Sequence, residues 1–369
     1  MTTPAPTTEQ PLLRHVMPEL DSIRGIAVAL VVIYHGFWTS YWKVGIHWRD
    51  HTAAVRALVD WSEPGWSGVQ LFFVLSGFLI TGILLDSTER PDYYKRFYFR
   101  RALRILPPYL LLLTVLLVTG SATPKFVLLA AGFVVNFAPL FGVVLSYGPL
   151  WSLAVEEQYY LIWPTVVRHV SRRSLVAFAA ALLVLAPLLR WNAFHDGAEL
   201  QWKYTWFVYD SLVTGSLTAA LLRRSGAMRA VVAKWALAVF IVAVVACIVG
   251  APYGLLDNTR ELGAALELTV MNTLFASGLV LALVVGTSRW HRVVQRPWLV
   301  FLGYISYGLY LCHMLFFALY DRLVVSPPVL ALGDMLTRFA VAGGAAVFVS
   351  WLSRRYYEDR FLRLKSRVA

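Results

Sequence analysis

Near its start the chain reads Leu20-Asp-Ser-Ile-Arg24-Gly-Ile-Ala-Val-Ala-Leu-Val-Val-Ile-Tyr-His35-Gly-Phe37. Most of these side chains are apolar, and about twenty such residues let a helix cross the hydrocarbon core of a bilayer. A histidine inside such a span is costly in lipid, so it marks a functional site by default. The stretch therefore predicts a membrane-spanning helix with a functional group at His35.

Apolar stretches of similar length recur along the whole chain. Of its 369 residues, 59% are hydrophobic and only 15% are charged, which is too apolar for an ordinary soluble domain. We therefore predict an all-α, polytopic integral membrane protein. Its ten expected transmembrane helices lie near residues 22–43, 68–85, 105–120, 151–167, 174–189, 205–222, 235–250, 267–287, 298–319 and 335–352.

The distribution of basic residues predicts how these spans are oriented. If the N-terminus is cytoplasmic and all ten spans cross, 24 of the 33 Lys and Arg residues fall on the cytoplasmic side. Basic residues concentrate on that side in membrane proteins, so we expect both termini in the cytoplasm. The net charge of +12 is then a topology signal, and we expect no nucleic-acid partner.

One further apolar stretch, residues 124–142, would reverse this pattern if it crossed, because every later basic cluster would move outside. We predict that it is re-entrant or half-spanning, which is tolerated where the backbone is buried in protein. Asn136, Pro139 and Gly142 fit a broken helix within it.

The first candidate constellation is Arg24 with His35. Eleven residues make about three helical turns, which places both side chains on one face, roughly 16 Å apart along the axis. Asp21 lies one turn before Arg24 and can hold its guanidinium by a charge-assisted bond. We expect positions 28 and 31 of this face to leave room for a thin ligand, and a neutral imidazole suits a general base. The alternative is a histidine hydrogen-bonded between helices and an arginine that anchors the helix end.

The second constellation is the basic run from Lys95 to Arg104. Arg101 and Arg104 share a helical face, and so do Arg100 and Arg104. Clustered guanidinium groups bind phosphates in bidentate fashion. The alternative is a cytoplasmic anchor that binds lipid headgroups, and charge density alone favours that interpretation.

The third constellation is Trp151-Ser-Leu-Ala-Val-Glu156-Glu157-Gln-Tyr-Tyr160. In a helix Ser152, Glu156 and either Tyr159 or Tyr160 share one face, while Glu157 points about 100° away. Adjacent carboxylates at membrane depth are hard to explain as anchors, so they predict a functional role. Polar packing between helices is the alternative.

The fourth constellation is a stripe of Ser306, Tyr310, His313 and Phe317 in the ninth expected span. His313 is a candidate catalytic or positioning group, and the alternative is a histidine whose hydrogen bonds are satisfied within the core.

Other patterns are weak. Cys247 and Cys312 both lie in apolar stretches, so we expect neither a disulfide framework nor a metal site. Gly68, Ser76 and Gly77 indicate a close helix–helix interface, because small residues let backbones approach in membranes.

Together, these segments resemble the acyltransferase family 3 proteins, membrane-bound O-acyltransferases that modify bacterial surface glycans and some antibiotics. The resemblance covers residues 19–353, between a polar N-terminal tail (1–18) and a basic cytoplasmic tail (354–369). Ser22 departs from the family pattern, in which glycine is common. The matching motifs are the R-x10-H pair Arg24 and His35, the segment 68–78, Arg101-x-x-Arg104, Trp151–Tyr160 and Ile305–His313.

This resemblance implies a multi-pass enzyme of the plasma (inner) membrane. Its donor is cytoplasmic acyl-CoA, most often acetyl-CoA, which is a co-substrate and not a bound cofactor. Its acceptor is a hydroxyl of an extracytoplasmic sugar or glycan. Many members carry a further hydrolase-like domain after the last span, and none is expected here because the chain ends soon after Trp351.

The resemblance also assigns roles. Arg24, Arg101 and Arg104 are expected to hold the CoA phosphates, with the pantetheine arm along the Arg24–His35 face. His35 is expected to act as general base or to carry the acyl group. Either glutamate then orients His35 or binds the acceptor. The remaining candidate substrate contacts are Asp21, Arg100, Ser152, Tyr160, Tyr310 and His313.

Two other interpretations stay open from the sequence. The acceptor could be an intracellular glycosylated small molecule such as a macrolide antibiotic. The charged residues could instead serve a non-enzymatic transporter of anions or lipids.

Overall fold

The computed structural model describes residues 17–38, 52–196, 203–324 and 331–364, and within these ranges it contains helices and no strands. Almost all of the predicted N-terminal tail and the last five residues of the predicted C-terminal tail lie outside the described residues. In chain order the elements are α1 (Pro18–Ile33), η1 (Tyr34–Trp38), α3 (Ala53–Ser62), η3 (Glu63–Ser67), α4 (Gly68–Leu85), α5 (Tyr93–Val118), α6 (Pro124–Ala131), η4 (Val135–Phe141), α7 (Leu150–His169), α8 (Arg172–His195), α9 (Thr205–Leu222), α10 (Gly226–Gly250), η5 (Ala251–Tyr253), α11 (Glu261–Gly286), α12 (His291–Val294), α13 (Pro297–Val324), α14 (Leu332–Arg338), η6 (Phe339–Gly343), α15 (Gly344–Leu352), η7 (Ser353–Glu358) and α16 (Asp359–Arg363).

The helical class predicted from the sequence is confirmed. Among the described residues, eight helical stretches are long and apolar enough to cross a membrane by length and composition, as expected of a polytopic membrane protein. Each of the ten predicted spans overlaps a long helical stretch, although residues 39–43 of the first lie outside the described residues, and α7 and α9 do not meet this criterion. Both carry carboxylates within the helix, which lowers their mean hydropathy.

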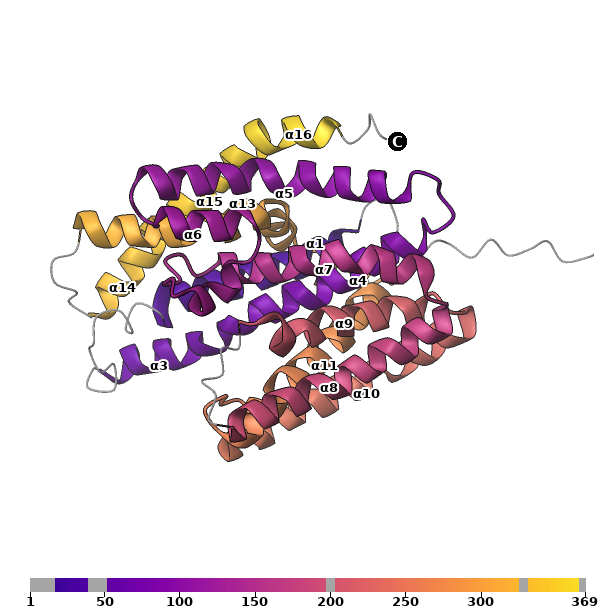
Figure 1. Cartoon of the computed structure of the whole chain (residues 1–369). Helices are drawn as coiled ribbons and strands as arrows, with labels where there is room; N and C mark the ends of the chain where they lie inside the picture. The colour runs from indigo at the N-terminus through magenta and orange to yellow at the C-terminus, as the bar shows by residue number, and fades with distance from the viewer. Residues whose placement is uncertain (1–16, 39–51, 197–202, 325–330, 365–369) are drawn as a thin grey trace, which may run out of the picture.

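The helices form a bundle with α1 and α4 at its centre (Figure 1). α13 packs against α1, and α9 packs against α4. On one side of the bundle α8, α10 and α11 form an outer layer, and on the other side α5 runs beside α16. The central position of α1 and α4 brings segments far apart in the sequence around them.

Small residues set how closely the central helices approach. A Cβ on Gly77 of α4 would lie 1.8 Å from the Leu212 carbonyl oxygen of α9, and one on Gly303 of α13 would lie 1.9 Å from that of Asp21 in α1. No side chain larger than hydrogen fits at such contacts. The close interface predicted from the small residues of α4 is therefore present.

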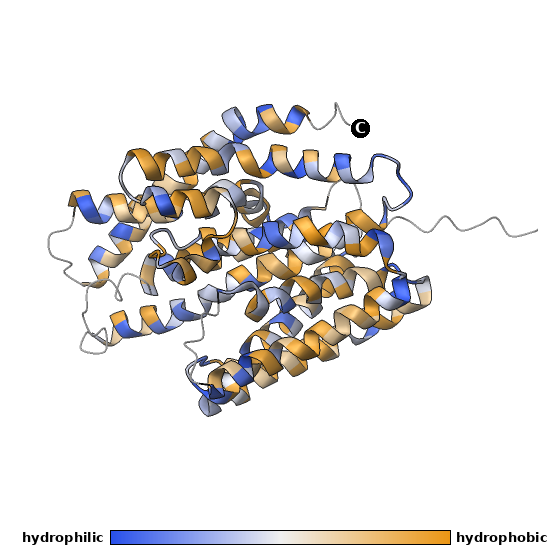
Figure 2. Ribbon diagram, viewed as in Figure 1, coloured by the Kyte–Doolittle hydropathy of each residue, from blue (hydrophilic) through white to orange (hydrophobic). Residues whose placement is uncertain are grey.

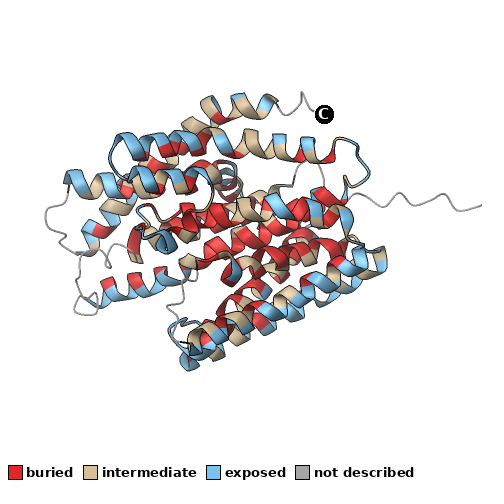
Figure 3. Cartoon of the chain, in the orientation of Figure 1, coloured by how far each residue is buried: buried red, intermediate tan, exposed pale blue. Residues whose placement is uncertain are grey.

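Burial falls from the centre to the edge of the bundle (Figure 3). α4 is mostly buried, while the outer helices α8 and α10 expose large apolar side chains such as Val242 and Ile248, which are 67% and 68% exposed. Figure 2 shows that these outer faces are hydrophobic. An apolar exposed face of this extent suits contact with lipid rather than water.

Helix ends gather at the two ends of the bundle. At one end Arg223, after α9, forms a bidentate pair with Asp86, after α4, at 2.9 and 3.2 Å, and its carbonyl oxygen accepts from Arg172 at the start of α8. At the other end Trp191 of α8 donates to Glu261 at the start of α11. Thus α4 and α9 run in one direction and α8 runs in the other.

The segment predicted to be re-entrant is broken in the structure. It forms the eight-residue helix α6, a turn at Phe133 with a φ of 53°, and the short η4. Eight residues rise only about 12 Å, which is too short to span a bilayer. Tyr109 and Gln158 donate to carbonyl oxygens of this segment, those of Ala130 and Phe133, so protein covers its backbone.

Residues beyond 353 continue the last long helix. They form η7 and α16, which pack against α5. The Tyr357 hydroxyl donates to the Pro107 carbonyl oxygen at 3.2 Å, and Arg354 pairs with Asp359. This part of the predicted basic tail therefore belongs to the folded bundle.

Candidate active site

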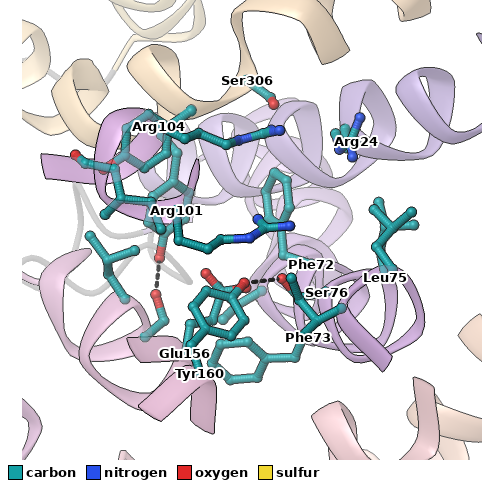
Figure 4. A pocket seen from close by; sticks show the side chains of 18 of the residues that line it. Arg24, Phe72, Phe73, Leu75, Ser76, Arg101, Arg104, Glu156, Tyr160 and Ser306 are labelled. Atoms are coloured by element: carbon teal, nitrogen blue, oxygen red, sulfur yellow. Dashed lines mark hydrogen bonds between the residues drawn. The ribbon is translucent and has the colours of Figure 1, made fainter. Parts of the chain in front are cut away.

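A cavity of about 200 Å³ lies among α1, α4, α5, α7 and α13. Figure 4 shows its polar side chains converging from helices that are far apart in the sequence. Its polar lining consists of Arg24, Ser76, Arg101, Arg104, Ser152, Glu156, Tyr160, Ser306, Tyr307 and Tyr310. Its apolar lining comes mainly from α4.

One face of α7 supplies three of these groups. Ser152, Glu156 and Tyr160 follow one another at i and i+4, and all three line the cavity as predicted. The Tyr160 hydroxyl lies 2.5 Å from Ser76 Oγ on α4, and Ser152 Oγ lies 2.5 Å from the Tyr310 hydroxyl on α13. These bonds fix the α7 face between its two neighbours.

Three guanidinium groups reach the cavity, against a single carboxylate, Glu156. Arg24 is held by Asp21 at 2.5 Å, as predicted. Arg101 lies over the Tyr160 ring at 5.5 Å. Among the described residues Arg104 forms no ion pair with a carboxylate. The excess of positive charge in an enclosed space favours an anionic ligand.

A second cavity of about 220 Å³ meets the first. Both are lined by Arg24, Arg104, Ser306 and Tyr307. The second cavity also touches Asp21 near the start of α1, and Arg354, Glu358 and Leu362 near the end of the chain. Together the two cavities extend from one end of the bundle inward, with Arg24 and Arg104 at their junction.

His35 lies in the π-helical turn η1 that follows α1. Its Nδ1 is 3.1 Å from Nε2 of His313 on α13 and 3.0 Å from the Val31 carbonyl oxygen. His313 Nδ1 is 2.8 and 3.1 Å from the carbonyl oxygens of Tyr310 and Leu309, so it must donate, which leaves His313 Nε2 as an acceptor. In a neutral ring His35 then donates through Nδ1, and the lone pair lies on Nε2.

The two histidines lie beyond the inner end of the first cavity and line neither cavity. Tyr310 connects the two regions, because its side chain lines the cavity and its ring centroid is 6.0 Å from that of His313. The hydrogen bonds of His313 are thus satisfied within the core, and one of them is made with His35.

The predicted space along the Arg24–His35 face is absent. Val28 and Val31, which lie on that face, are fully buried and line neither cavity. The reason is close packing: a Cβ on Gly68 of α4 would lie 2.4 Å from the Ala27 carbonyl oxygen. The open space lies beside α4 and α7 instead.

Two candidates from the sequence stand apart. Arg100 and Glu157 line neither cavity, since each is one residue, or about 100° of helix, away from a neighbour that does. Arg100 Nε and Glu157 Oε1 are buried and have no hydrogen-bond partner among the described residues. Of the two adjacent glutamates, the geometry puts Glu156 in the cavity.

The sequence did not single out Tyr307, Arg354 and Glu358 as site residues, and it treated Ser76 as a packing residue. Ser76 shares a face of α4 with Phe72, Phe73 and Ile80, which also line the cavity. Helical spacing could therefore have shown that these residues lie together. Arg354 and Glu358 looked like part of a solvated tail. The described residues hold no group of three or more His, Cys, Asp or Glu side chains that could ligate a metal ion.

A family model described as an acyltransferase domain matches residues 17–355 of the chain. The chain belongs to this acyltransferase family. The match includes every candidate site residue named above except Glu358 and Leu362, and it confirms the resemblance seen in the motifs.

The curated relatives are O-acetyltransferases by name. The chain is 31% identical over 170 residues to peptidoglycan O-acetyltransferase OatA of Listeria monocytogenes, 28% over 203 residues to the putative peptidoglycan O-acetyltransferase YrhL of Bacillus subtilis, and 32% over 176 residues to the putative O-acetyltransferase SAS0844 of Staphylococcus aureus. These alignments cover 41%, 49% and 41% of the chain, but only 24%, 29% and 24% of the relatives. No solved structure matches the chain.

Proposed function

We propose that this protein is a membrane-embedded O-acyltransferase, which moves an acyl group, in the simplest case acetyl, from cytoplasmic acyl-CoA to a hydroxyl of an extracytoplasmic sugar. One observation carries the proposal. A cavity rich in arginine is lined by Tyr310, and Tyr310 lies beside His313, which is hydrogen-bonded to His35. An anionic donor can therefore bind at one end while its reactive group approaches an imidazole.

The proposed orientation has ten crossings, with both ends of the chain in the cytoplasm. It is supported by the opposite directions of α8 and α9 and by the sequence, in which this orientation puts 24 of the 33 Lys and Arg residues on the cytoplasmic side. The second cavity, near the start of α1 and the end of the chain, then opens toward the cytoplasm. The η1 turn that carries His35 lies toward the opposite face.

The donor would bind through its phosphates. Arg24 and Arg104 border both cavities and Arg101 borders the inner one, so phosphates at the junction meet three guanidinium groups. The pantetheine arm is thin and largely uncharged, which suits the apolar wall that α4 gives the inner cavity. The thioester then comes to lie beside Tyr310, on the side of the histidines.

His35 Nε2 would act as the general base. It takes the proton from the acceptor hydroxyl while the oxygen attacks the thioester carbonyl, the C–S bond breaks, and the CoA thiolate leaves and takes up a proton. His313 accepts the hydrogen bond from His35 Nδ1 and keeps the tautomer in which Nε2 is basic. In a second route Nε2 attacks the thioester first and carries the acyl group to the acceptor.

The first acceptor to test is a peptidoglycan sugar, because two of the relatives are named for peptidoglycan. Purified protein in a lipid nanodisc is given acetyl-CoA labelled in the acetyl group together with peptidoglycan fragments. We expect labelled, O-acetylated sugar and an equal amount of free CoA. If neither CoA nor labelled sugar forms with a panel of peptidoglycan, polysaccharide and glycosylated small-molecule acceptors, the proposed function is wrong.

A further inference from the structure

The π-helical turn η1 is held from outside by one arginine. Arg338, at the end of α14, donates through Nη1 to the Gly36 carbonyl oxygen at 2.7 Å. Gly36 follows His35 directly, so this bond fixes the peptide next to the imidazole. A π-helical turn widens the backbone spiral, and such turns are frequent at functional sites.

The other nitrogens of Arg338 are held in place by Asp321 on α13. Arg338 Nε and Nη2 donate to the two carboxylate oxygens at 2.5 and 2.8 Å, and the guanidinium lies 4.7 Å from the centre of the Phe317 ring. The fork geometry of arginine is therefore used completely: two bonds orient the plane and the third reaches Gly36. A lysine ammonium also has three N–H donors, but all of them sit on one nitrogen and cannot reproduce the spacing of the fork.

One face of α13 contacts η1 at three successive levels. His313, Phe317 and Asp321 are spaced by four residues, so they share that face. His313 bonds to His35, Phe317 contacts Gly36, and Asp321 reaches Gly36 through Arg338.

Aromatic side chains also pack against the η1 turn. Phe339, the residue after Arg338, stacks on Phe37 with ring centroids 4.5 Å apart. A Cβ on Gly36 would lie 2.5 Å from the Phe339 ring and 3.1 Å from that of Phe317, so the ring packing requires glycine here. The turn thus contacts α13, α14 and η6, and it also packs against α3 and η3.

We infer that the Arg338–Asp321 pair positions the imidazole of His35 for acyl transfer. The inference rests on the proposed function, because it concerns the turnover step there assigned to His35. Arg338 and Asp321 line neither cavity, so they act through the backbone of η1 and not through the donor. The alternative is a purely structural ion pair that ties α13 to α14.

Arg338→Gln separates these alternatives. The matched control is Arg223→Gln, which removes another bidentate arginine–aspartate pair between helix ends but lies at the end of the bundle opposite to η1. Each variant is compared with wild type for kcat, for the KM of acetyl-CoA, for thermal stability, and for hydrogen–deuterium exchange of a peptide that contains residues 34–38.

We expect Arg338→Gln to lower kcat by about tenfold to a hundredfold, since a shift of about 1 Å in a catalytic group can have an effect of that size. The KM for acetyl-CoA should change little, and exchange should rise at residues 34–38. Arg338→Lys, which keeps the charge without the fork, should restore little of the lost kcat. Arg223→Gln should keep the wild-type kcat and the wild-type exchange at η1.

Equal losses of kcat in Arg338→Gln and Arg223→Gln, or unchanged exchange at residues 34–38 in Arg338→Gln, would overturn the inference. If Arg338→Gln does not fold, Asp321→Asn replaces it. A lower kcat and a little-changed KM for acetyl-CoA are expected for that variant too. If wild type does not consume acetyl-CoA at all, the proposed function fails, while the exchange measurement still decides whether Arg338 holds the η1 turn.

Discussion

Replacing Arg104 tests the proposed donor site most sharply. Arg104 borders both cavities and forms no ion pair with a carboxylate among the described residues, and in the proposed function its partner is a donor phosphate. Arg104→Gln keeps much of the length and polarity of the side chain but removes its charge. We expect CoA to bind this variant more weakly, with little change in kcat at saturating acetyl-CoA.

The expected size of the effect follows from the contacts available. A hydrogen bond to a charged group contributes about 1.5–3 kcal/mol, and about 1.4 kcal/mol corresponds to a tenfold change in affinity. Losing the Arg104 contact should therefore raise the Kd of CoA by about tenfold to a hundredfold. Arg24 and Arg101 still face the same cavity, so the lower part of this range is expected.

The assay is equilibrium binding of CoA to purified protein in nanodiscs, because Kd is then free of any chemical step. The comparison variant is Arg100→Gln, which changes the same residue type on the same helix but outside both cavities. Its Kd should stay close to wild type. Equal Kd values for wild type and Arg104→Gln, or an equal weakening by Arg100→Gln, would refute the phosphate site and leave the arginines as membrane anchors.

Two further predictions concern the fold. Gly77→Ala should lower the free energy of unfolding by about 1–3 kcal/mol, because its Cβ would lie 1.8 Å from the Leu212 carbonyl oxygen. Thermal unfolding in detergent checks this against Gly344→Ala, whose Cβ meets nothing within 4 Å. An equal Tm for the two variants would contradict the prediction. Arg190→Met should lower that free energy by about 3–5 kcal/mol, since it strips the buried Asp210 carboxylate of its 3.1 Å partner. Arg190→Met with Asp210→Leu should recover much of the Tm, and a double variant no more stable than the single one would count against the buried-charge explanation.

Helical spacing predicted the inward face of α7 well. Ser152, Glu156 and Tyr160 line one cavity because side chains at i and i+4 must point the same way, whatever the rest of the fold does. The pairing of Asp21 with Arg24 follows equally from sequence separation on a helix. Local geometry is enough for predictions of this kind.

The location of the cavity depends on contacts between helices and could not be predicted in this way. Periodicity puts Val28 and Val31 on the face between Arg24 and His35, but it does not show that α4 packs tightly there. The π-helical form of η1 could not be predicted either. Its contact with Arg338 joins residues about three hundred positions apart. Tertiary packing decides such features, and a single sequence carries no direct record of it.

The central claim is that His35 performs the acyl transfer, and His35→Ala tests it directly. The measurement is the transfer of labelled acetyl from acetyl-CoA to a sugar acceptor by the purified variant in nanodiscs, with CoA binding measured on the same sample. We predict wild-type CoA affinity, because His35 lines neither cavity, and a loss of transfer of about a hundredfold or more, in the range of general acid–base catalysis. A variant that binds CoA and still transfers acetyl at the wild-type rate would contradict the claim.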